Sequence, residues 1–424
     1  MEYTFSPLTD FEQLESALEK LYGQGQQAAQ AARYRGLLQG FSDTFGGAEH
    51  LAVFSAPGRT EIGGNHTDHQ HGKVLAGSVN LDVIAAVAPS GDNTIRIQSE
   101  GFPMDVIDLD DLSVHEEEKN SSAAIIRGIA AWFAQRGCRV EGFNAYTTSN
   151  VLKGSGLSSS AAFEVLVGTI INHLFYGQQC TPVQIAQIGQ YAENVYFGKP
   201  SGLLDQMAAS VGNMVTVDFA DNANPIVERV DFDFVHSGYA LCIVDSGADH
   251  ADLTDEYAAV TRELKEVCAH FGKSVLREVP EAEFYAELPT LRRKAGDRAV
   301  LRAIHIYEDN RRVEGQVEAL RTGDFEAFLK LVTASGLSSW RCLQNVIPAG
   351  YTHHQEVAVA LMVCEKLLNG RGACRVHGGG FAGTIQAFVP LDLLESFQTE
   401  MERILGDGSC HVLSIRPVGG VRLA

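Results

Sequence analysis

The stretch Lys153–Ala162, K-G-S-G-L-S-S-S-A-A, places two glycines and four serines directly before a long apolar segment, Ala161–Ile171. Glycine allows the backbone to approach an anion closely. The apolar segment predicts a buried helix, and the free N–H groups and partial positive charge at its N-terminus suit a phosphate. The stretch matches neither the Walker A pattern nor the Rossmann fingerprint, which needs a third glycine. We therefore predict a phosphate-binding loop, the alternative being a loop that only caps a core helix.

Two further segments define a family resemblance. Residues 56–69 read A-P-G-R-T-E-I-G-G-N-H-T-D-H, and residues 376–383 read V-H-G-G-G-F-A-G. With the glycine–serine stretch between them, they resemble the GHMP kinases, a family of sugar and small-metabolite kinases, over nearly the whole chain. Residues 58–69 resemble the galactokinase branch in particular, whose pattern there is G-R-V-N-L-I-G-E-H-T-D-Y. The resemblance implies an α+β fold of two lobes with the active site in the cleft between them.

Composition limits the classes of partner. The chain has 424 residues, 45% of them hydrophobic, and a formal net charge of −20. Such an acidic surface argues against binding to nucleic acids or anionic membranes, which need Lys and Arg to neutralise phosphates. The N-terminus lacks the features of a signal peptide and no run of 18 apolar residues occurs, so we expect a cytoplasmic protein. We expect a monomer or a weak homodimer whose partners are a small-molecule sugar and ATP.

Strands and helices are predicted in mixed order rather than strict alternation, which favours α+β layers. We predict an N-terminal lobe over residues 1–235, with the first segment and the phosphate-binding loop. A C-terminal α+β lobe over residues 236–424 would contain the third, glycine-rich segment. Those glycines are expected to pack against the phosphate loop and the nucleotide, although a tight turn before a strand would need them as well.

The resemblance implies that the protein uses ATP and Mg²⁺. The implied ATP-binding residues are Gly154, Ser155, Gly156, Leu157, Ser158, Ser159 and Ser160. Ser160 and Glu164 lie four residues apart, so they share one face of the predicted helix. A hydroxyl and a carboxylate are oxygen ligands suited to Mg²⁺. Spacing alone favours a capping serine and a solvated glutamate, whereas the resemblance favours a metal site.

Two residues are implied to act in phosphoryl transfer. Asp205 stands in G-L-L-D-Q, which matches the family's G-x-x-D-Q, and would serve as the base for a sugar hydroxyl. Arg59 follows a predicted strand and would be its electrostatic partner, because a nearby cation favours an ionised carboxylate. The alternatives are a helix N-cap for Asp205 and a surface ion pair for Arg59.

The resemblance further implies that the sugar is bound by Asn65, His66, Asp68, Gly202 and Tyr257. The spacing H-x-x-H-x-H in residues 66–71 could instead indicate a transition-metal site, but it is not a standard zinc pattern. A polar loop around a sugar explains the same residues. In residues 302–313, charged side chains at helical spacing predict a salt-bridge network between helices rather than a catalytic group.

The residues of the sugar segment also depart from the family pattern. Asn65 stands where the family has a glutamate, and His69 replaces a tyrosine. A neutral amide can accept and donate, so it would tolerate a carboxylate at C6 of the sugar. Galacturonate, arabinose and N-acetylgalactosamine therefore remain open as substrates beside galactose.

The reaction that the resemblance implies is ATP-dependent phosphorylation of the anomeric C1 hydroxyl of galactose. A non-catalytic sugar sensor on the same fold is the alternative from another class, but the intact serine–alanine run, Asp205 and Arg59 favour an enzyme. A kinase for a non-sugar such as mevalonate is disfavoured by the sugar-like signature at residues 66–68.

Overall fold

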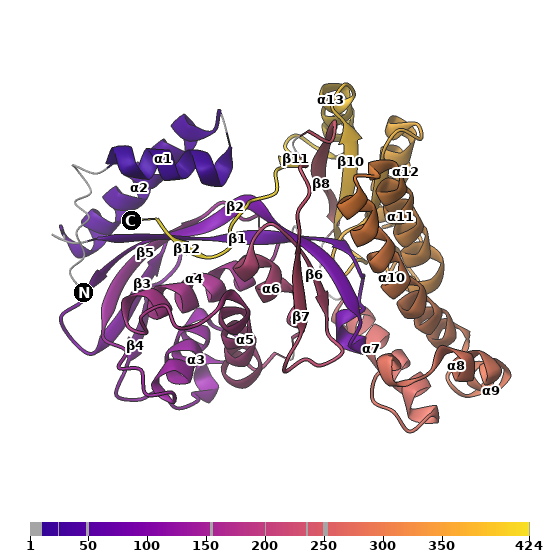
Figure 1. Ribbon diagram of the computed structural model, residues 1–424, viewed down its shortest axis with the longest axis horizontal. Coiled ribbons are helices and arrows are strands. Elements are labelled where there is room, and N and C mark those ends of the chain that lie inside the picture. The colour runs from indigo at the N-terminus through magenta and orange to yellow at the C-terminus, as the bar shows by residue number, and fades with distance from the viewer. Residues whose placement is uncertain are drawn as a thin grey trace.

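The computed structural model describes residues 11–23, 25–47, 51–152, 156–199, 201–234, 236–248 and 253–423. Figure 1 shows two lobes, each built on one β-sheet with helices packed against it. The first sheet has the spatial order β12 (Val421–Arg422), β1 (Ala52–Gly63), β2 (Lys73–Pro89), β5 (Phe143–Ser149), β3 (Thr94–Ser99) and β4 (Asp105–Asp108). β6 (Met214–Asp218) pairs with the beginning of β2, and β7 (Ile226–Val230) pairs with β6. Only the pair of β3 with β5 is parallel within this described sheet.

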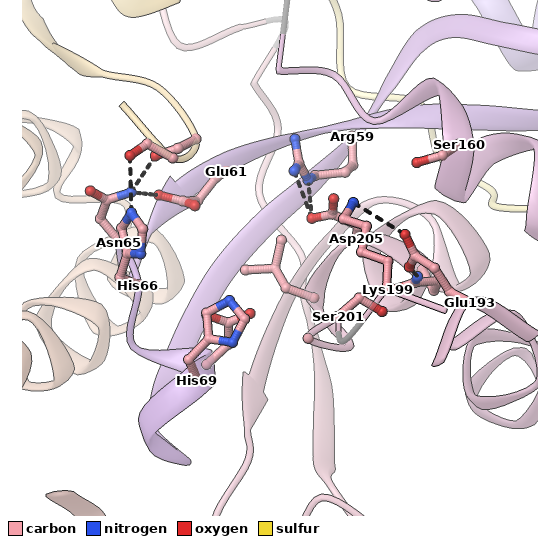
Figure 2. A pocket seen from close by; sticks show the side chains of 16 residues that line it. Arg59, Glu61, Asn65, His66, His69, Ser160, Glu193, Lys199, Ser201 and Asp205 are labelled. Atoms are coloured by element: carbon pink, nitrogen blue, oxygen red, sulfur yellow. Dashed lines mark hydrogen bonds and ion pairs between the residues drawn. The ribbon is translucent and has the colours of Figure 1, made fainter. Parts of the chain in front are cut away.

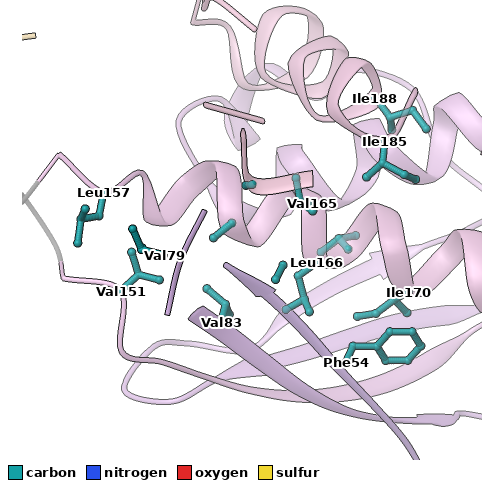
Figure 3. Close-up of a cluster of buried hydrophobic side chains, with 14 of the residues drawn as sticks. Phe54, Val79, Val83, Val151, Leu157, Val165, Leu166, Ile170, Ile185 and Ile188 are labelled. Atoms are coloured by element: carbon teal, nitrogen blue, oxygen red, sulfur yellow. The ribbon is translucent and has the colours of Figure 1, made fainter. Parts of the chain in front are cut away.

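Helices cover both faces of the first sheet (Figure 1). One face is covered by α1 (Phe11–Tyr22) and α2 (Gln27–Phe45). The other is covered by α3 (Ser122–Ala134), α4 (Ser159–Leu174), α5 (Pro182–Ala192) and α6 (Leu204–Val211). Side chains of β1 alternate between them, since Val53 packs with α1 and α2 while Phe54 packs near Ile170 of α4 (Figure 3). α4 confirms the helix predicted after the glycine–serine stretch.

The second sheet has the order β11 (Cys410–Leu413), β8 (Tyr239–Ala248), β10 (Gly383–Pro390) and β9 (Ala373–Val376). One face packs on α12 (Glu356–Leu368) and α13 (Leu394–Leu405), and the other on α10 (Asp297–Thr322) and α11 (Phe325–Ser338). Beside α10 lie α7 (Thr254–His270), α8 (Glu281–Ala286) and α9 (Leu288–Lys294). Short 3₁₀ turns span Asp68–Gln70, Glu116–Glu118 and Leu276–Glu278, and π turns span Glu193–Phe197 and Ser339–Leu343.

The apolar core is continuous between the lobes. One cluster of buried side chains runs from Phe54 of β1 to Leu241 of β8 and Phe388 of β10. The predicted division at residue 235 stays a prediction, and β8 begins close to it at Tyr239. The end of the chain, however, returns to the first lobe, where Arg422 of β12 pairs with Phe54 of β1. Among the described residues, no helix combines the length and low polarity needed to cross a membrane.

A buried cluster of charged and polar side chains around Asp82 holds the C-terminal segment against the first lobe. Asp82 of β2 is fully buried and accepts hydrogen bonds from Arg416 Nη1 at 2.8 Å, Arg33 Nη1 at 2.5 Å and Ser55 Oγ at 2.5 Å, and also from the Tyr22 hydroxyl. Burial alone would raise the pKa of Asp82, but the two guanidinium groups outweigh it and hold the pKa below its ordinary value. The first lobe therefore depends on a residue from the far end of the chain.

Replacing Arg416 with Met should destabilise the protein by about 3 to 5 kcal/mol, because it removes one partner of a buried ion pair. Chemical denaturation gives this difference. The matched control is Arg371→Met, which breaks the exposed pair of Arg371 with Asp392 and should change stability little. Equal effects of the two substitutions would contradict the role assigned to the cluster.

Candidate active site

A polar cavity of about 220 Å³ lies between the lobes, at the end of β1 (Figure 2). Glycines 378 and 379 of the second lobe close one side. The predicted site residues that line it are Arg59, Asn65, His66, Asp68, Ser160, Gly202 and Asp205. The fold therefore brings these predicted residues, which come from segments far apart in the chain, into a single site. We call it the polar cavity.

Asp205, in the first turn of α6, is a carboxylate of this cavity that is held by two neighbouring side chains. Arg59 contacts Asp205 Oδ1 through Nε at 2.7 Å and Nη2 at 2.6 Å. Ser158 Oγ donates to Asp205 Oδ2. The Asp205 side chain is 36% exposed whereas that of Arg59 is 8% exposed, so the carboxylate faces the cavity from a buried cationic support. A carboxylate accepts about four hydrogen bonds, which leaves capacity at Oδ2 for a hydroxyl of a ligand.

The backbone before α4 fixes this arrangement. Gly156 has a φ of +69° and Ser158 a φ of +54°, so the loop turns sharply just before the helix. Arg59 N–H donates to the Leu157 carbonyl at 3.0 Å, and Arg59 Nη1 donates to the Gly156 carbonyl. The loop therefore holds the guanidinium against Asp205 and fixes both partners.

The loop after β1 is held by α10. Asn65 N–H donates to Asp309 Oδ2 at 2.9 Å, and the Asn65 carbonyl accepts from His305 Nε2 at 3.0 Å. Arg302 pairs with Glu263 of α7 at 2.8 Å, so one bridge of the predicted network does join two helices. Arg312, by contrast, pairs with Asp309 inside α10. The sequence did not indicate that His305 and Asp309 hold the loop of the cavity.

His66 presents a neutral ring to the polar cavity. Its Nε2 donates to the Gly379 carbonyl at 3.0 Å. Burial lowers the pKa of His66 to about 4, so the ring carries one proton near neutral pH and Nδ1 can accept a hydrogen bond. Asp68 lies opposite Gly202, where a Cβ would overlap Asp68 Oδ2. A side chain at residue 202 would therefore displace the Asp68 carboxylate.

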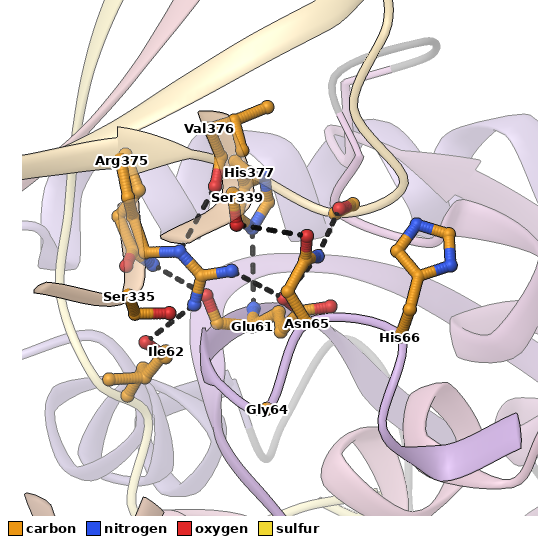
Figure 4. Close-up of polar contacts among 12 residues, drawn as sticks. Glu61, Ile62, Gly64, Asn65, His66, Ser335, Ser339, Arg375, Val376 and His377 are labelled. Atoms are coloured by element: carbon orange, nitrogen blue, oxygen red, sulfur yellow. Dashed lines mark hydrogen bonds and ion pairs between the residues drawn. The ribbon is translucent and has the colours of Figure 1, made fainter. Parts of the chain in front are cut away.

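Glu61 lines the polar cavity although the sequence gave it no role. It lies two residues after Arg59 on β1, hence on the same side of the strand. Its Oε1 accepts from Arg375 Nη2 at 2.8 Å and Asn65 Nδ2 at 2.9 Å (Figure 4). The motif itself could have drawn attention to Glu61, because the galactokinase pattern has asparagine at that position.

A second, more apolar cavity of about 530 Å³ adjoins the first and shares Ser160 and Glu193 with it. Its apolar lining includes Phe102, Ile125, Val151, Phe163 and Phe197. The predicted residues Ser159 and Glu164 also line it. A mostly apolar cavity beside a helix N-terminus has the form of a nucleotide site.

Glu164 and Glu193 share one amide donor between the two cavities. Gln206 Nε2 donates to Oε2 of each glutamate at 2.9 Å, while Glu164 Oε1 is buried without a hydrogen-bond partner among the described residues. Burial, reinforced by the charge of Glu193, raises the pKa of Glu164 to about 8. Glu193 stands at the start of a π turn, a distortion frequent at functional sites. Lys199 Nζ lies 3.3 Å from Glu193 Oε1, so Glu193 has a cationic partner, whereas the amide of Gln206 is the donor that Glu164 has among the described residues.

Comparisons with known proteins assign the family. Residues 39–89 match the model of the galactokinase galactose-binding signature, and residues 124–213 match that of the N-terminal domain of GHMP kinases. The galactokinase of Lacticaseibacillus paracasei is 32% identical over 313 residues, which cover 71% of this chain and 77% of that protein. The chain belongs to the galactokinase family.

Other members of the family are similar over a larger share of the chain. The Streptomyces coelicolor galactokinase is 29% identical over 340 residues, 80% of this chain and 84% of its own. The crystal structure of Lactococcus lactis galactokinase complexed with galactose superposes with a TM-score of 0.77 at 25% identity, covering 92% and 99% of the two chains. A mevalonate kinase structure, with a TM-score of 0.60 at 13% identity, shares the fold. The predicted family and α+β GHMP kinase fold are confirmed, and the protein is a sugar kinase.

Some predicted residues of the galactokinase-like site lie elsewhere or outside the described chain. Gly154 and Ser155 fall among the residues that the structure does not describe. The Leu157 side chain is fully buried, so only its backbone can face a phosphate. Tyr257 does not line either cavity, and its hydroxyl donates to the Gly380 carbonyl at 2.7 Å. Tyr257 therefore supports the glycine loop from behind, and a contact with the sugar stays a prediction.

Replacing Glu164 with Gln should stabilise the metal-free protein by about 1 to 3 kcal/mol at pH 8.5 and by much less at pH 5.5. An unfolded glutamate ionises near its ordinary pKa of 4.5, whereas folded Glu164 keeps its proton to about pH 8. The folded state therefore binds more protons in this interval, so its stability falls as the pH rises and levels off above pH 8. Glutamine removes that loss.

Thermal unfolding in a chelating buffer across this pH range tests the prediction. Glu365→Gln, an exposed change on α12, is the matched control and should show no such trend. A stabilisation by Glu164→Gln that is the same at both pH values would contradict it.

Proposed function

We propose that the protein transfers the γ-phosphoryl group of ATP to the C1 hydroxyl of galactose. The observation that carries this proposal is the placement of Asp205, held by Arg59 and Ser158 in the polar cavity beside the apolar one. The galactose-binding signature at residues 39–89 and the likeness to a galactose complex support galactose as the sugar. The two adjoining cavities give the sugar and the nucleotide separate sites that meet at Ser160.

The reaction joins the C1 oxygen of the sugar to the γ-phosphorus and breaks the bond from that phosphorus to the bridging oxygen of ADP. Asp205 Oδ2 accepts the hydrogen bond of the C1 hydroxyl and then its proton. Arg59 keeps Asp205 in place and opposes the negative charge that develops on the phosphoryl group. The backbone N–H groups of residues 156–158, just before α4, would donate to the nucleotide phosphates, where charge accumulates.

Mg²⁺ fits the residues between the two cavities. Glu164 Oε1 is buried without a partner among the described residues, and Ser160 lies one helical turn before it. Glu193 pairs with Lys199 at 3.3 Å, whereas Glu164 has the shared amide of Gln206 as its donor among the described residues, so a cation beside Glu164 would complete the site. We assign Ser160 and Glu164 as its ligands, with Glu193 close by. When bound, Mg²⁺ neutralises charge on the phosphate oxygens, and it takes one or two carboxylates together with phosphate and water.

Replacing Asp205 with Asn should lower kcat with galactose by about 10² to 10⁴-fold, the contribution typical of a general base, while ATP still binds. ADP release measures the rate, and NMR of the product locates the phosphate on C1. Methyl galactoside, whose C1 oxygen is blocked, should not be phosphorylated by the unaltered enzyme. Phosphorylation of methyl galactoside, or full activity of Asp205→Asn, would refute the proposal, whereas sugar-dependent ATP binding without turnover would favour a sensor.

Replacing Gly202 with Ala should raise KM for galactose about tenfold or more and change kcat less, since the new Cβ displaces the Asp68 carboxylate from the sugar. Steady-state kinetics separate the two constants. Gly36→Ala in α2 is the control, because a Cβ there meets no atom within 4 Å. An unchanged KM in Gly202→Ala would show that Asp68 does not hold the sugar.

A further inference from the structure

The hydrogen bonds of Asn65 use the whole capacity of its side chain. Asn65 Nδ2 donates to Glu61 Oε1 at 2.9 Å and to the Gly378 carbonyl at 2.6 Å. Asn65 Oδ1 accepts from Asn345 Nδ2 at 2.8 Å and Ser339 Oγ at 3.4 Å. An amide has two N–H donors and two acceptor lone pairs, so all four are used inside the protein. Asn65 is also fully buried, and it has nothing left to offer a sugar.

Glu61 is the neighbouring group that keeps a free oxygen. Its Oε1 is held by Arg375 and Asn65, whereas Oε2 accepts no hydrogen bond from the described residues. The residue lines the polar cavity, and its side chain is 9% exposed. The other two directions of the Arg375 guanidinium are bound to the carbonyls of Ile62 and Val376, so the position of the carboxylate is rigid (Figure 4).

The charge of Glu61 is compensated chiefly by Arg375, which lies behind the carboxylate, and secondly by Arg59 in the cavity lining. Arg375 is completely buried and lies 2.8 Å from Glu61 Oε1. Burial raises the pKa of Glu61, and Arg375 followed by Arg59 opposes that rise. Since the compensating charges sit behind and beside the carboxylate, its free oxygen remains an acceptor for a ligand.

The sequence pattern also links residues 61 and 65. In G-R-V-N-L-I-G-E-H-T-D-Y the fourth position is asparagine and the eighth is glutamate. This chain has Glu61 at the fourth and Asn65 at the eighth, so the two residue types have exchanged places. The exchanged side chains touch each other in the structure. The pair therefore keeps one amide and one carboxylate, and the carboxylate has moved onto β1.

We propose that Glu61 is the specificity-determining carboxylate of the sugar site, with Asn65 and Arg375 as positioning residues. This inference rests on the proposed sugar-kinase role of the polar cavity. An ionised carboxylate only accepts hydrogen bonds, so Glu61 selects a neutral sugar that presents a hydroxyl there. It repels a sugar carboxylate at the same place. Considered alone, the neutral Asn65 left galacturonate open as a substrate. With Glu61 beside it, this end of the cavity is negatively charged and disfavours galacturonate.

The decisive variant is Glu61→Gln. Its amide oxygen can still accept from Arg375 and Asn65, while an NH₂ group replaces the free oxygen. KM for galactose should rise about 10- to 100-fold, the effect of losing a hydrogen bond to a charged group, with kcat changing by less. The ratio of kcat/KM for galacturonate to that for galactose should rise. Glu326→Gln, an exposed change on α11, is the control and should alter neither constant.

The double substitution Glu61→Asn with Asn65→Glu restores the family order. It should recover part of the galactose affinity that Glu61→Asn alone loses, and thermal unfolding shows whether each variant is folded. An unchanged KM and unchanged sugar preference in folded Glu61→Gln, or no recovery in a folded double variant, would overturn the inference.

Galactose binding measured by calorimetry separates this inference from the proposed reaction. If the unaltered protein binds galactose without phosphorylating it, the proposed function fails, and the inference is then judged on binding alone. Weaker binding by Glu61→Gln would support the inference in that case, and equal binding would overturn it. If Asp205→Asn is inactive while Glu61→Gln is normal, the reaction stands and the inference is wrong.

Discussion

The backbone of strand β1 forms hydrogen bonds with both lobes at once, and these bonds determine the geometry of the site. Its backbone pairs with β2, while its last residues are bound by side chains of the second lobe. Gln386 donates to the Glu61 carbonyl at 3.0 Å, Arg375 donates to the Ile62 carbonyl at 2.8 Å, and Glu61 N–H donates to His377 at 3.2 Å. Buried polar groups without partners are costly, so these bonds hold the two lobes in one relative position. Arg59 and Glu61 project from that fixed strand into the polar cavity.

Two carboxylates of this region differ in what surrounds them, and the difference suits two roles. Asp205 meets a guanidinium and a hydroxyl, so its charge is balanced and a lone pair of Oδ2 remains available on the side of the polar cavity. Glu164 lies in an almost closed space beside another glutamate, with an amide as its donor. The first arrangement suits transfer of a proton, and the second suits a bound cation. Both arrangements depend on α4. The helix contains Glu164, and Ser158, just before its first turn, donates the hydroxyl hydrogen bond to Asp205.

Local patterns were enough to predict the parts of the site that a short segment encodes. The glycine–serine stretch and the helix after it followed from the local pattern, and the approach of Arg59 to Asp205 was implied by the resemblance of two short motifs to the GHMP kinases. The surroundings of Asn65 did not, because its partners Ser339, Asn345 and Gly378 lie hundreds of residues away in the sequence. A residue type that can both donate and accept does not reveal which of its bonds the protein has already used. The return of the chain end to the first sheet likewise left no local signal, since β12 is only two residues long.

That return has a consequence for biosynthesis. β1 leaves the ribosome early, yet its outer edge pairs with Arg422, and Asp82 waits for Arg416, which is made after the whole second sheet. Until then one edge of the first sheet is open and a buried acid lacks one of its two guanidinium partners. Contacts between segments so distant in sequence slow folding. The nascent first lobe therefore exposes an unpaired edge of β1 until β12 has been made.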